Sequence, residues 1–207
     1  LSEAVRKYMN HIFGEYGLIT IDPNSKNLKK TISDIVVDDV VNNTIEKVEK
    51  SSENITDVYV RKINFFFQGS DFRERIDKTD KYNILSTNLS FTEKEIKEKI
   101  ESSPELFSPN VITRCLYQQR ILPNVCYLGG PAEIVYWQSF KKFFDNYNVS
   151  YPVLVPRDFV LLLTSKIQKL INNLKLSSND LFIDKNKIEN KVLAIESDES
   201  KNFKREI

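Results

Sequence analysis

The segment that most constrains the fold is an apolar run at 125–128 followed directly by Gly-Gly-Pro at 129–131. A short apolar run predicts a strand, the two glycines predict a sharp turn, and proline suits the first turn of a helix. Apolar periodicity predicts that this helix covers about 131–147, and a second apolar run at 151–155 predicts another strand. The sequence therefore predicts a strand, helix, strand unit, which is typical of α/β proteins.

The two predicted strands should be parallel, because a strand-helix-strand crossover in one sheet is almost always right-handed. Their carboxyl ends then meet at one sheet edge, where open α/β sheets bind ligands. Gly129 and Gly130 follow the first strand, and Pro156 and Arg157 follow the second. A glycine turn, free helical N–H groups and a cation at this edge would suit a phosphate. The alternative is a plain connector beside a surface arginine.

A helical wheel over 131–147 places Trp137, Phe140 and Phe144 on one face. Glu133 falls on the same side, in the first turn, next to the glycine turn. Two interpretations remain open for this carboxylate. It either contacts a ligand at the sheet edge or only complements the helix dipole.

A second helix is predicted from Pro109 to about Leu122, with Ser108 as its N-cap. An apolar arc of this helix contains Val111, Ile112, Cys115, Leu116 and Leu122, and Gln119 projects into it. Arg114 and Gln118 are i, i+4 neighbours beside the arc, a pair that can hold a carboxylate or a phosphate. Structural hydrogen bonding is the alternative for these polar side chains.

The rest of the chain predicts a mixture of helices and strands. Helices are expected at 1–13, at 26–49 with a break near Asp38, and after the capping-box threonine at 92. A strand is expected at 18–21, a β-rich stretch at 58–67, and a hairpin from 72–76 and 82–85. An apolar stretch to 163 and a helix to about 174 precede a charged helical tail.

We therefore divide the chain into a core region, 1–175, and the charged tail, 176–207. The tail lacks a sustained heptad pattern, so two interpretations stay open. It is either the start of a longer helical element, such as a coiled coil, or a solvated end. The chain begins in what reads as the middle of a helix, which suggests a fragment of a longer protein.

Composition excludes several classes of protein. Thirty Lys and Arg against 29 Asp and Glu leave a net charge of +1, which predicts neither a nucleic-acid nor a membrane partner. One histidine and two cysteines cannot build a structural zinc site or a histidine-based triad, and we predict no metal ligands, although oxygen-ligated Mg²⁺ stays open. Cys115 and Cys126 are predicted to be small core residues, which with the low cysteine count favours a reducing, cytoplasmic location.

The run from Phe107 to Arg157 resembles the cysteine-adding enzymes of bacillithiol biosynthesis. The likeness continues upstream through INFFFQGSDFRERI at 63–76 and FGEYGLITIDP at 13–23. The resemblance implies an α/β fold with a Rossmann-like parallel sheet core, similar to nucleotidylyltransferases and class I aminoacyl-tRNA synthetases. It also implies mixed α/β insertions and a carboxyl-terminal coiled coil. This chain would be the second part of the core, with a truncated helical end.

The reaction implied by the resemblance joins the carboxyl of L-cysteine to the amine of glucosaminyl-malate, the last step to bacillithiol. Kinship with the synthetases implies that ATP activates the carboxyl. The missing coiled coil would provide a homodimer contact, and the fragment should fold but not ligate cysteine alone. Two other classes stay open: a non-catalytic nucleotide- or sugar-binding module of the same fold, and a helical interaction protein.

The resemblance also implies roles for individual residues. Glu133 and Arg114 are implied as catalytic residues. The residues implied at the cofactor are Gly129, Gly130, Pro131 and Arg157, and those at the substrate are Gln118, Tyr136 and Arg157. Pro156 also matches the family. Two positions depart from the family pattern. The family usually has proline where Cys115 stands and an acid where Gln119 stands, so no acid or metal ligand is implied at position 119.

Overall fold

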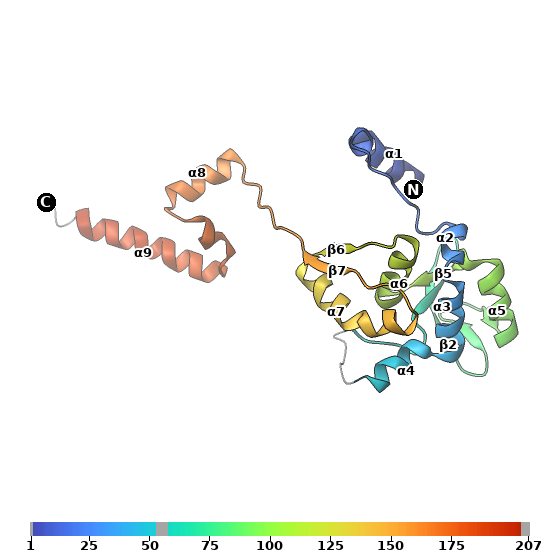
Figure 1. The fold of residues 1–207 in the computed structure, drawn as a ribbon. Coiled ribbons are helices and arrows are strands. Elements are labelled where there is room, and N and C mark those ends of the chain that lie inside the picture. Colours follow the sequence, from blue (N-terminus) through green and yellow to red (C-terminus); the bar gives the residue numbers. More distant parts are fainter. Residues whose placement is uncertain (1, 53–57, 204–207) are drawn as a thin grey trace. The chain divides into compact units, whose positions relative to one another are not determined.

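The computed structural model describes residues 2–52 and 58–203. The chain forms two compact units, Leu1–Arg157 and Asp158–Ile207 (Figure 1). The boundary expected from the sequence, at residue 175, lies inside the second unit. We describe each unit by itself.

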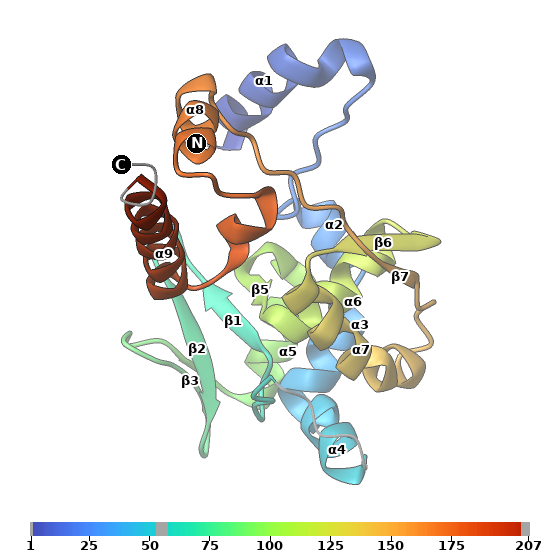
Figure 2. The same ribbon diagram turned by 90° about the vertical axis from the view of Figure 1, so that its left-hand side faces the viewer.

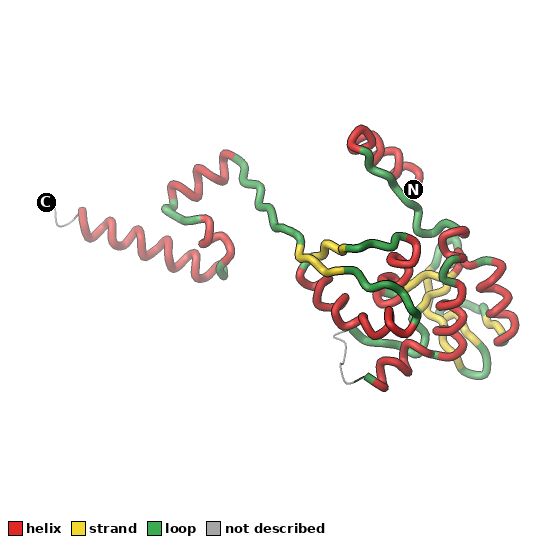
Figure 3. Tube along the Cα trace, in the orientation of Figure 1, coloured by secondary structure: helices red, strands yellow, loops and turns green. Residues whose placement is uncertain are grey.

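Helices and strands alternate irregularly along the chain (Figure 3). The elements of the first unit, in chain order, are α1 (Ser2–Phe13), η1 (Gly14–Tyr16), α2 (Lys26–Lys30), α3 (Ser33–Val37), the π-helical turn η2 (Asp38–Asn42), α4 (Thr44–Ser51), β1 (Phe65–Gln68), β2 (Arg73–Lys78), β3 (Tyr82–Ile84), β4 (Ser90–Phe91), α5 (Glu93–Ser102), η3 (Pro104–Leu106), β5 (Phe107–Pro109), α6 (Val111–Ile121), β6 (Cys126–Gly129), α7 (Pro131–Asn146) and β7 (Val153–Pro156). The second unit contains α8 (Ser165–Asn173), η4 (Ser178–Phe182) and α9 (Lys185–Phe203).

The larger sheet is antiparallel and has the strand order β4-β3-β2-β1-β5. The predicted hairpin is confirmed, because β2 pairs with β3 across the polar turn between them. Phe65 and Phe67 alternate with half-buried neighbours along β1, as expected for a strand that covers a core with one face. Figure 2 shows β1, β2 and β3 side by side, with helices α3, α5 and α6 to one side of them.

The strand, helix, strand unit is confirmed. Strands β6 and β7 pair in parallel, with Leu128 opposite Val155 and Gly129 opposite Pro156. They form a separate two-stranded sheet, and side chains such as Leu128 and Val153 remain exposed. A parallel sheet core is therefore not confirmed, since the buried core rests on antiparallel strands. The physical reason is that a parallel sheet forms a core only when other elements cover both of its faces.

One hydrophobic core joins the helices to the antiparallel sheet. The amphipathic pattern of α7 is confirmed, because Trp137, Phe140 and Phe144 are buried. The Trp137 ring stacks on Tyr127 of β6 with ring centres 4.2 Å apart. The Tyr151 hydroxyl donates to the carbonyl of Trp137, at 2.7 Å. These contacts fasten α7 to its flanking strands and so fix the edge at which β6 and β7 end.

Several expectations about local structure are wrong. Residues 18–21 form no strand, because this apolar run has no pairing partner within the described residues. Residues 58–64 precede the strand rather than belonging to it. The helix expected from Pro109 begins at Val111, because Phe107–Pro109 pairs with β1 as an edge strand. Proline is tolerated at such an edge.

Asn110, not Ser108, caps this helix, and its side chain accepts hydrogen bonds from the N–H groups of Ile112 and Thr113. The helix expected over 26–49 is interrupted at Thr31–Ile32 and at Asn43, which has a φ of 55°, and not at Asp38, where the chain passes from α3 into the π-helical turn η2 without a break. The capping box of α5 is confirmed. The Thr92 hydroxyl accepts from the N–H of Glu95, whose carboxylate accepts from the N–H of Thr92.

The second unit is helical, as expected for the tail. Asp180 in η4 accepts a 2.6 Å hydrogen bond from Lys191 of α9, which holds these two elements together. The hydrogen bonds from Lys191 and Ser177 lower the pKa of Asp180 to about 2. The coiled coil stays a prediction.

Candidate functional site at the edge of the parallel strands

The candidate site begins where β6 and β7 end. The N–H of Arg157 donates to the carbonyl of Gly129 at 2.9 Å, which continues the parallel pairing one residue past β7. The glycine turn and the arginine are thereby fixed side by side. The sheet edge predicted from the crossover rule is confirmed by this pairing.

Glu133 reaches back over the glycine turn. Its Oε2 accepts a 2.7 Å hydrogen bond from the N–H of Gly130, so the carboxylate caps the first turn of α7. The same oxygen lies 3.8 Å from Nη1 of Arg157, an ion pair that is largely solvated. Gly130, Glu133 and Arg157 therefore gather at one sheet edge, as the sequence predicts. The capping bond supports the structural interpretation of Glu133 and leaves a ligand role open.

The absence of a side chain at Gly130 matters for Arg157. A Cβ built on Gly130 would lie 3.0 Å from Nη2 of Arg157, closer than such contacts normally come. Because Gly130 has a φ of −69°, the glycine is needed here for space rather than for an unusual backbone conformation.

Arg114 and Tyr136 lie in the same electrostatic neighbourhood as Glu133. Burial raises the pKa of Tyr136 to about 12, the charge of Glu133 adds to this effect, and Arg114 opposes it. Burial and the charge of Glu133 likewise raise the pKa of Tyr127. The Arg114 side chain is exposed and forms no hydrogen bond or ion pair with the described residues. The charges of both predicted catalytic residues, Glu133 and Arg114, therefore act on Tyr136.

Arg114 and Gln118 also line a cavity of about 510 Å³. Lys29 of α2 and Arg73 of β2 line the same cavity, and sequence reasoning missed both. Arg73 lies within the family-like segment 63–76, so that segment offered a signal for it. Nothing in the local sequence pattern distinguishes Lys29.

Gln119 has a structural contact. It is buried, and its Nε2 donates to the carbonyl of Asn124 at 2.8 Å, which ties the end of α6 to the loop before β6. Its Oε1 has no hydrogen-bond partner among the described residues. The predicted apolar arc is right for Ile112, Cys115 and Leu116, but Val111 and Leu122 are exposed because they lie at the two ends of the helix.

The two cysteines differ, and the expectation that both lie in the core is wrong for Cys126. Cys115 is buried and burial raises the pKa of its thiol to about 12, whereas Cys126 is exposed on β6. The Cys115 thiol also donates to the carbonyl of Val111, at 3.3 Å. Cys126 is exposed because it starts a strand of the small two-stranded sheet, whose outer side chains are uncovered.

We expect iodoacetamide to alkylate Cys126 in the native protein at neutral pH and to leave Cys115 unmodified. Alkylation requires an accessible thiolate, and Cys115 offers neither access nor a thiolate. Peptide mass spectrometry after a short exposure measures both sites. Addition of denaturant should expose Cys115 as the control. Equal labelling of the two cysteines before unfolding would contradict the packing of α6.

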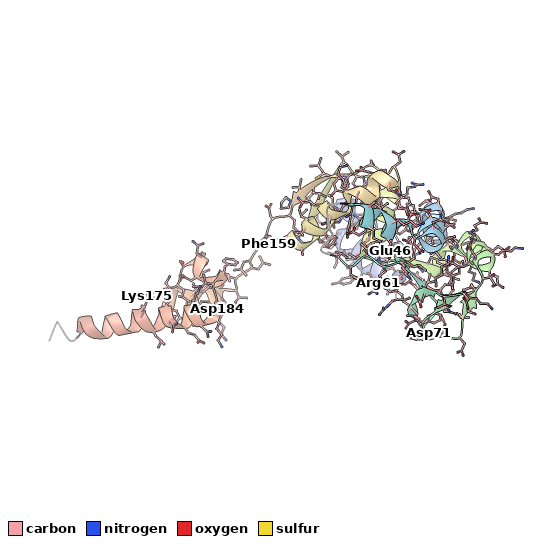
Figure 4. The ribbon with its side chains drawn as sticks, turned by 90° about the horizontal axis from the view of Figure 1, so that it is seen from below. Glu46, Arg61, Asp71, Phe159, Lys175 and Asp184 are labelled. Atoms are coloured by element: carbon pink, nitrogen blue, oxygen red, sulfur yellow. The ribbon has the colours of Figure 1, made fainter. Side chains whose placement is uncertain are left out.

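A second cavity, of about 310 Å³, lies apart from the predicted site residues. It is lined by charged side chains that include Glu46 and Arg61 (Figure 4).

Across residues 2–52 and 58–203, no group of three or more His, Cys, Asp or Glu side chains is placed to hold a metal ion. Binding of Mg²⁺ by oxygen ligands stays open. Within the same residues, no helix combines the length and the apolar character needed to cross a membrane.

Comparisons with known proteins place the chain in one family. Residues 1–158 match the family described as bacillithiol biosynthesis BshC, N-terminal Rossmann-like domain. Three similar proteins each carry the name "Putative cysteine ligase BshC". The chain is 41% identical to the one from Flavobacterium johnsoniae over 94% of its length, 36% identical to the one from Cytophaga hutchinsonii over 88%, and 24% identical to one from Staphylococcus aureus over 88%. It spans 37%, 37% and 36% of their lengths, respectively.

Proposed function

This chain belongs to the BshC family of bacillithiol biosynthesis, and from that premise we propose that the full-length protein is a cysteine ligase. In this proposal it joins the carboxyl of L-cysteine to the amine of glucosaminyl-malate in the last step to bacillithiol. The observation that carries the proposal is the gathering of Gly130, Glu133 and Arg157 where the parallel strands end. This is the edge at which open α/β folds bind their ligands.

The glycine turn has the features that a nucleotide phosphate needs. Arg157 lies against the bare backbone of Gly130, and the positive end of the α7 dipole points at the same place. Gly129, Gly130, Pro131 and Arg157 would hold ATP, which supplies activation of the cysteine carboxyl when bound. Glu133 would release the N–H of Gly130 to the phosphate and turn its carboxylate to an amine or a ribose hydroxyl.

The acceptor would lie next to this turn, toward α6. Arg114 and Gln118 would provide cationic and amide donors for its carboxylates, and Tyr136 would provide a hydroxyl whose pKa responds to the charges of Arg114 and Glu133. This placement brings the acceptor amine near the activated carboxyl. Alignment of the reacting groups in this way accounts for a large part of the rate enhancement in two-substrate enzymes.

The exposed side chains of β6 and β7 support a further part of the proposal. Leu128 and Val153 are each 63% exposed, although strands in parallel sheets are normally covered on both faces. We propose that other parts of the full-length protein cover these strands and supply the remaining active-site residues. The 207-residue chain alone should then form no bacillithiol.

Mass spectrometry tests the proposal. The full-length protein is incubated with L-cysteine, glucosaminyl-malate and ATP, and we expect bacillithiol to form only when all three are present. A Gly130→Ala variant tests the site itself, because its new Cβ displaces the Arg157 side chain while the backbone conformation at this position suits alanine. We expect this variant to fold normally and to form product more slowly. Binding of ATP or of the sugar without any product would favour the non-catalytic module instead.

A further inference from the structure

The cavity beside α6 contains an unusual concentration of positive charge. Lys29, Arg73 and Arg114 approach it from α2, β2 and α6, three elements that are distant in the sequence. None of the described residues that line the cavity is acidic. The nearby carboxylate of Asp22 accepts a hydrogen bond from the N–H of Asn24, which directs it into its own loop. The cations therefore have no matching anion from the described part of the chain.

Lys29 is the least expected member of this group, because its side chain is 96% buried. Its ammonium donates a 2.6 Å hydrogen bond to the carbonyl of Phe107 and lies 5.7 Å from the centre of the Tyr117 ring. Burial, with repulsion from Arg73, lowers the pKa of this ammonium to about 8. Burying a lysine without a carboxylate partner costs free energy, which a bound anion would offset.

Arg73 is held firmly in place. Its Nε donates to Oγ of Ser108 and its Nη2 to the carbonyl of Pro109, both at 2.9 Å. The guanidinium also lies 3.8 Å above the ring of Phe66. These bonds use two of its five N–H groups, so three remain for a ligand. A guanidinium fixed in this way is suited to bidentate recognition of a carboxylate or phosphate.

We propose that this cavity binds a small dicarboxylate, with one carboxylate at Lys29 and Arg73 and the other at Arg114 and Gln118. Two separate donor pairs match two carboxylates better than one phosphate, whose oxygens all surround a single atom. A volume of about 510 Å³ also leaves room for more than a four-carbon acid. Resting on the proposed function, the dicarboxylate is the malyl part of glucosaminyl-malate. Lys29 and Arg73 are then additional substrate-binding residues.

The test is isothermal titration of the full-length protein with L-malate, in the absence of cysteine and ATP. We expect L-malate to bind, and Arg73→Gln and Arg114→Gln each to weaken its affinity at least tenfold. Arg75→Gln is the matched control, because Arg75 lies on the same strand but lines a different cavity. Its affinity for L-malate should equal that of the wild-type protein.

Arg114→Gln keeps the test decisive if Arg73→Gln fails to fold, because the Arg114 side chain is exposed and has no hydrogen-bond or ion-pair partner among the described residues. Titrations with L-lactate and inorganic phosphate distinguish the ligand chemistry. We expect lactate, which has one carboxylate, and phosphate to bind more weakly than L-malate. Tighter binding of phosphate, no binding of L-malate, or an unchanged L-malate affinity in Arg114→Gln would each overturn the proposal.

The ligation assay separates this proposal from the proposed function. If the variants lose malate binding but the wild-type protein forms no bacillithiol, the dicarboxylate cavity is supported and the proposed ligase function is rejected. If the wild-type protein forms bacillithiol but Arg114→Gln binds malate with unchanged affinity, the ligase function is supported and the dicarboxylate cavity is rejected.

Discussion

Replacing Asp39 by alanine should lower the free energy of unfolding by about 4 kcal/mol, because two buried donors lose their acceptor at about 1–3 kcal/mol each. The two carboxylate oxygens of Asp39 accept from the N–H and from the Nδ2 of Asn64, and both residues are almost completely buried. Asn64 in turn accepts from Asn110 and Thr113 at the start of α6. Asp39 therefore connects η2 to the helix that carries Arg114. Urea unfolding measures the loss.

The loss should depend on pH in a defined direction. Burial, only partly opposed by hydrogen bonds from Asn64, raises the pKa of Asp39 from 3.8 to about 7. Between these values the folded protein holds a proton that the unfolded chain releases, so this group makes the wild-type protein less stable as the pH rises. The Asp39→Ala variant lacks this dependence. Its deficit in stability should therefore be largest near pH 4 and smaller at pH 7.

Asp71→Ala is the matched control, since Asp71 is exposed and bonds to its neighbour Ser70 (Figure 4). Its stability should change by about 0.5 kcal/mol or less. An Asp39→Ala protein as stable as this control at pH 4 would contradict the buried network. A deficit that grows between pH 4 and pH 7 would contradict the raised pKa.

Replacing Arg114 by alanine in the full-length protein should lower kcat/KM by about 10–100-fold, the equivalent of one hydrogen bond to a charged group at about 1.5–3 kcal/mol. The melting temperature should stay the same, because the Arg114 side chain is exposed and forms no hydrogen bond or ion pair with the described residues. Arg114→Lys should also lose activity if the contact is bidentate, since lysine cannot form a two-pronged bond. Product formation and thermal unfolding, measured on the same samples, check both parts.

Arg120→Ala provides the converse control on the same helix. Arg120 forms a 2.9 Å ion pair with Asp34, so this variant should lose up to about 1 kcal/mol of stability and keep its activity. A large loss of stability in Arg114→Ala together with unchanged specific activity would show that Arg114 is a structural residue.

The local pattern of the sequence determined much of the candidate site. Gly-Gly-Pro between two apolar runs allows few structures other than a strand, a turn and a helix, and the right-handed crossover then places Gly130 and Arg157 at one edge. The position of Glu133 in the first turn of α7 followed from the same spacing. The start of α6 was less predictable. The sequence predicted Ser108 as the N-cap, whereas pairing of Phe107–Pro109 with β1 moves the helix start to Val111 and makes Asn110 the N-cap.

The rest was decided by the tertiary structure, because it depends on residues that only folding brings together. Lys29, Arg73 and Arg114 are far apart in the sequence, and nothing next to Lys29 in the sequence predicts its burial. β5 joins the sheet beside β1, and α6, which follows β5, then lines one cavity together with residues of α2 and β2. The buried position of Asp39 likewise depends on Asn64, which is 25 residues away. Spacing along the chain determines helices, strands and turns, whereas charge pairing and burial depend on which elements pack together.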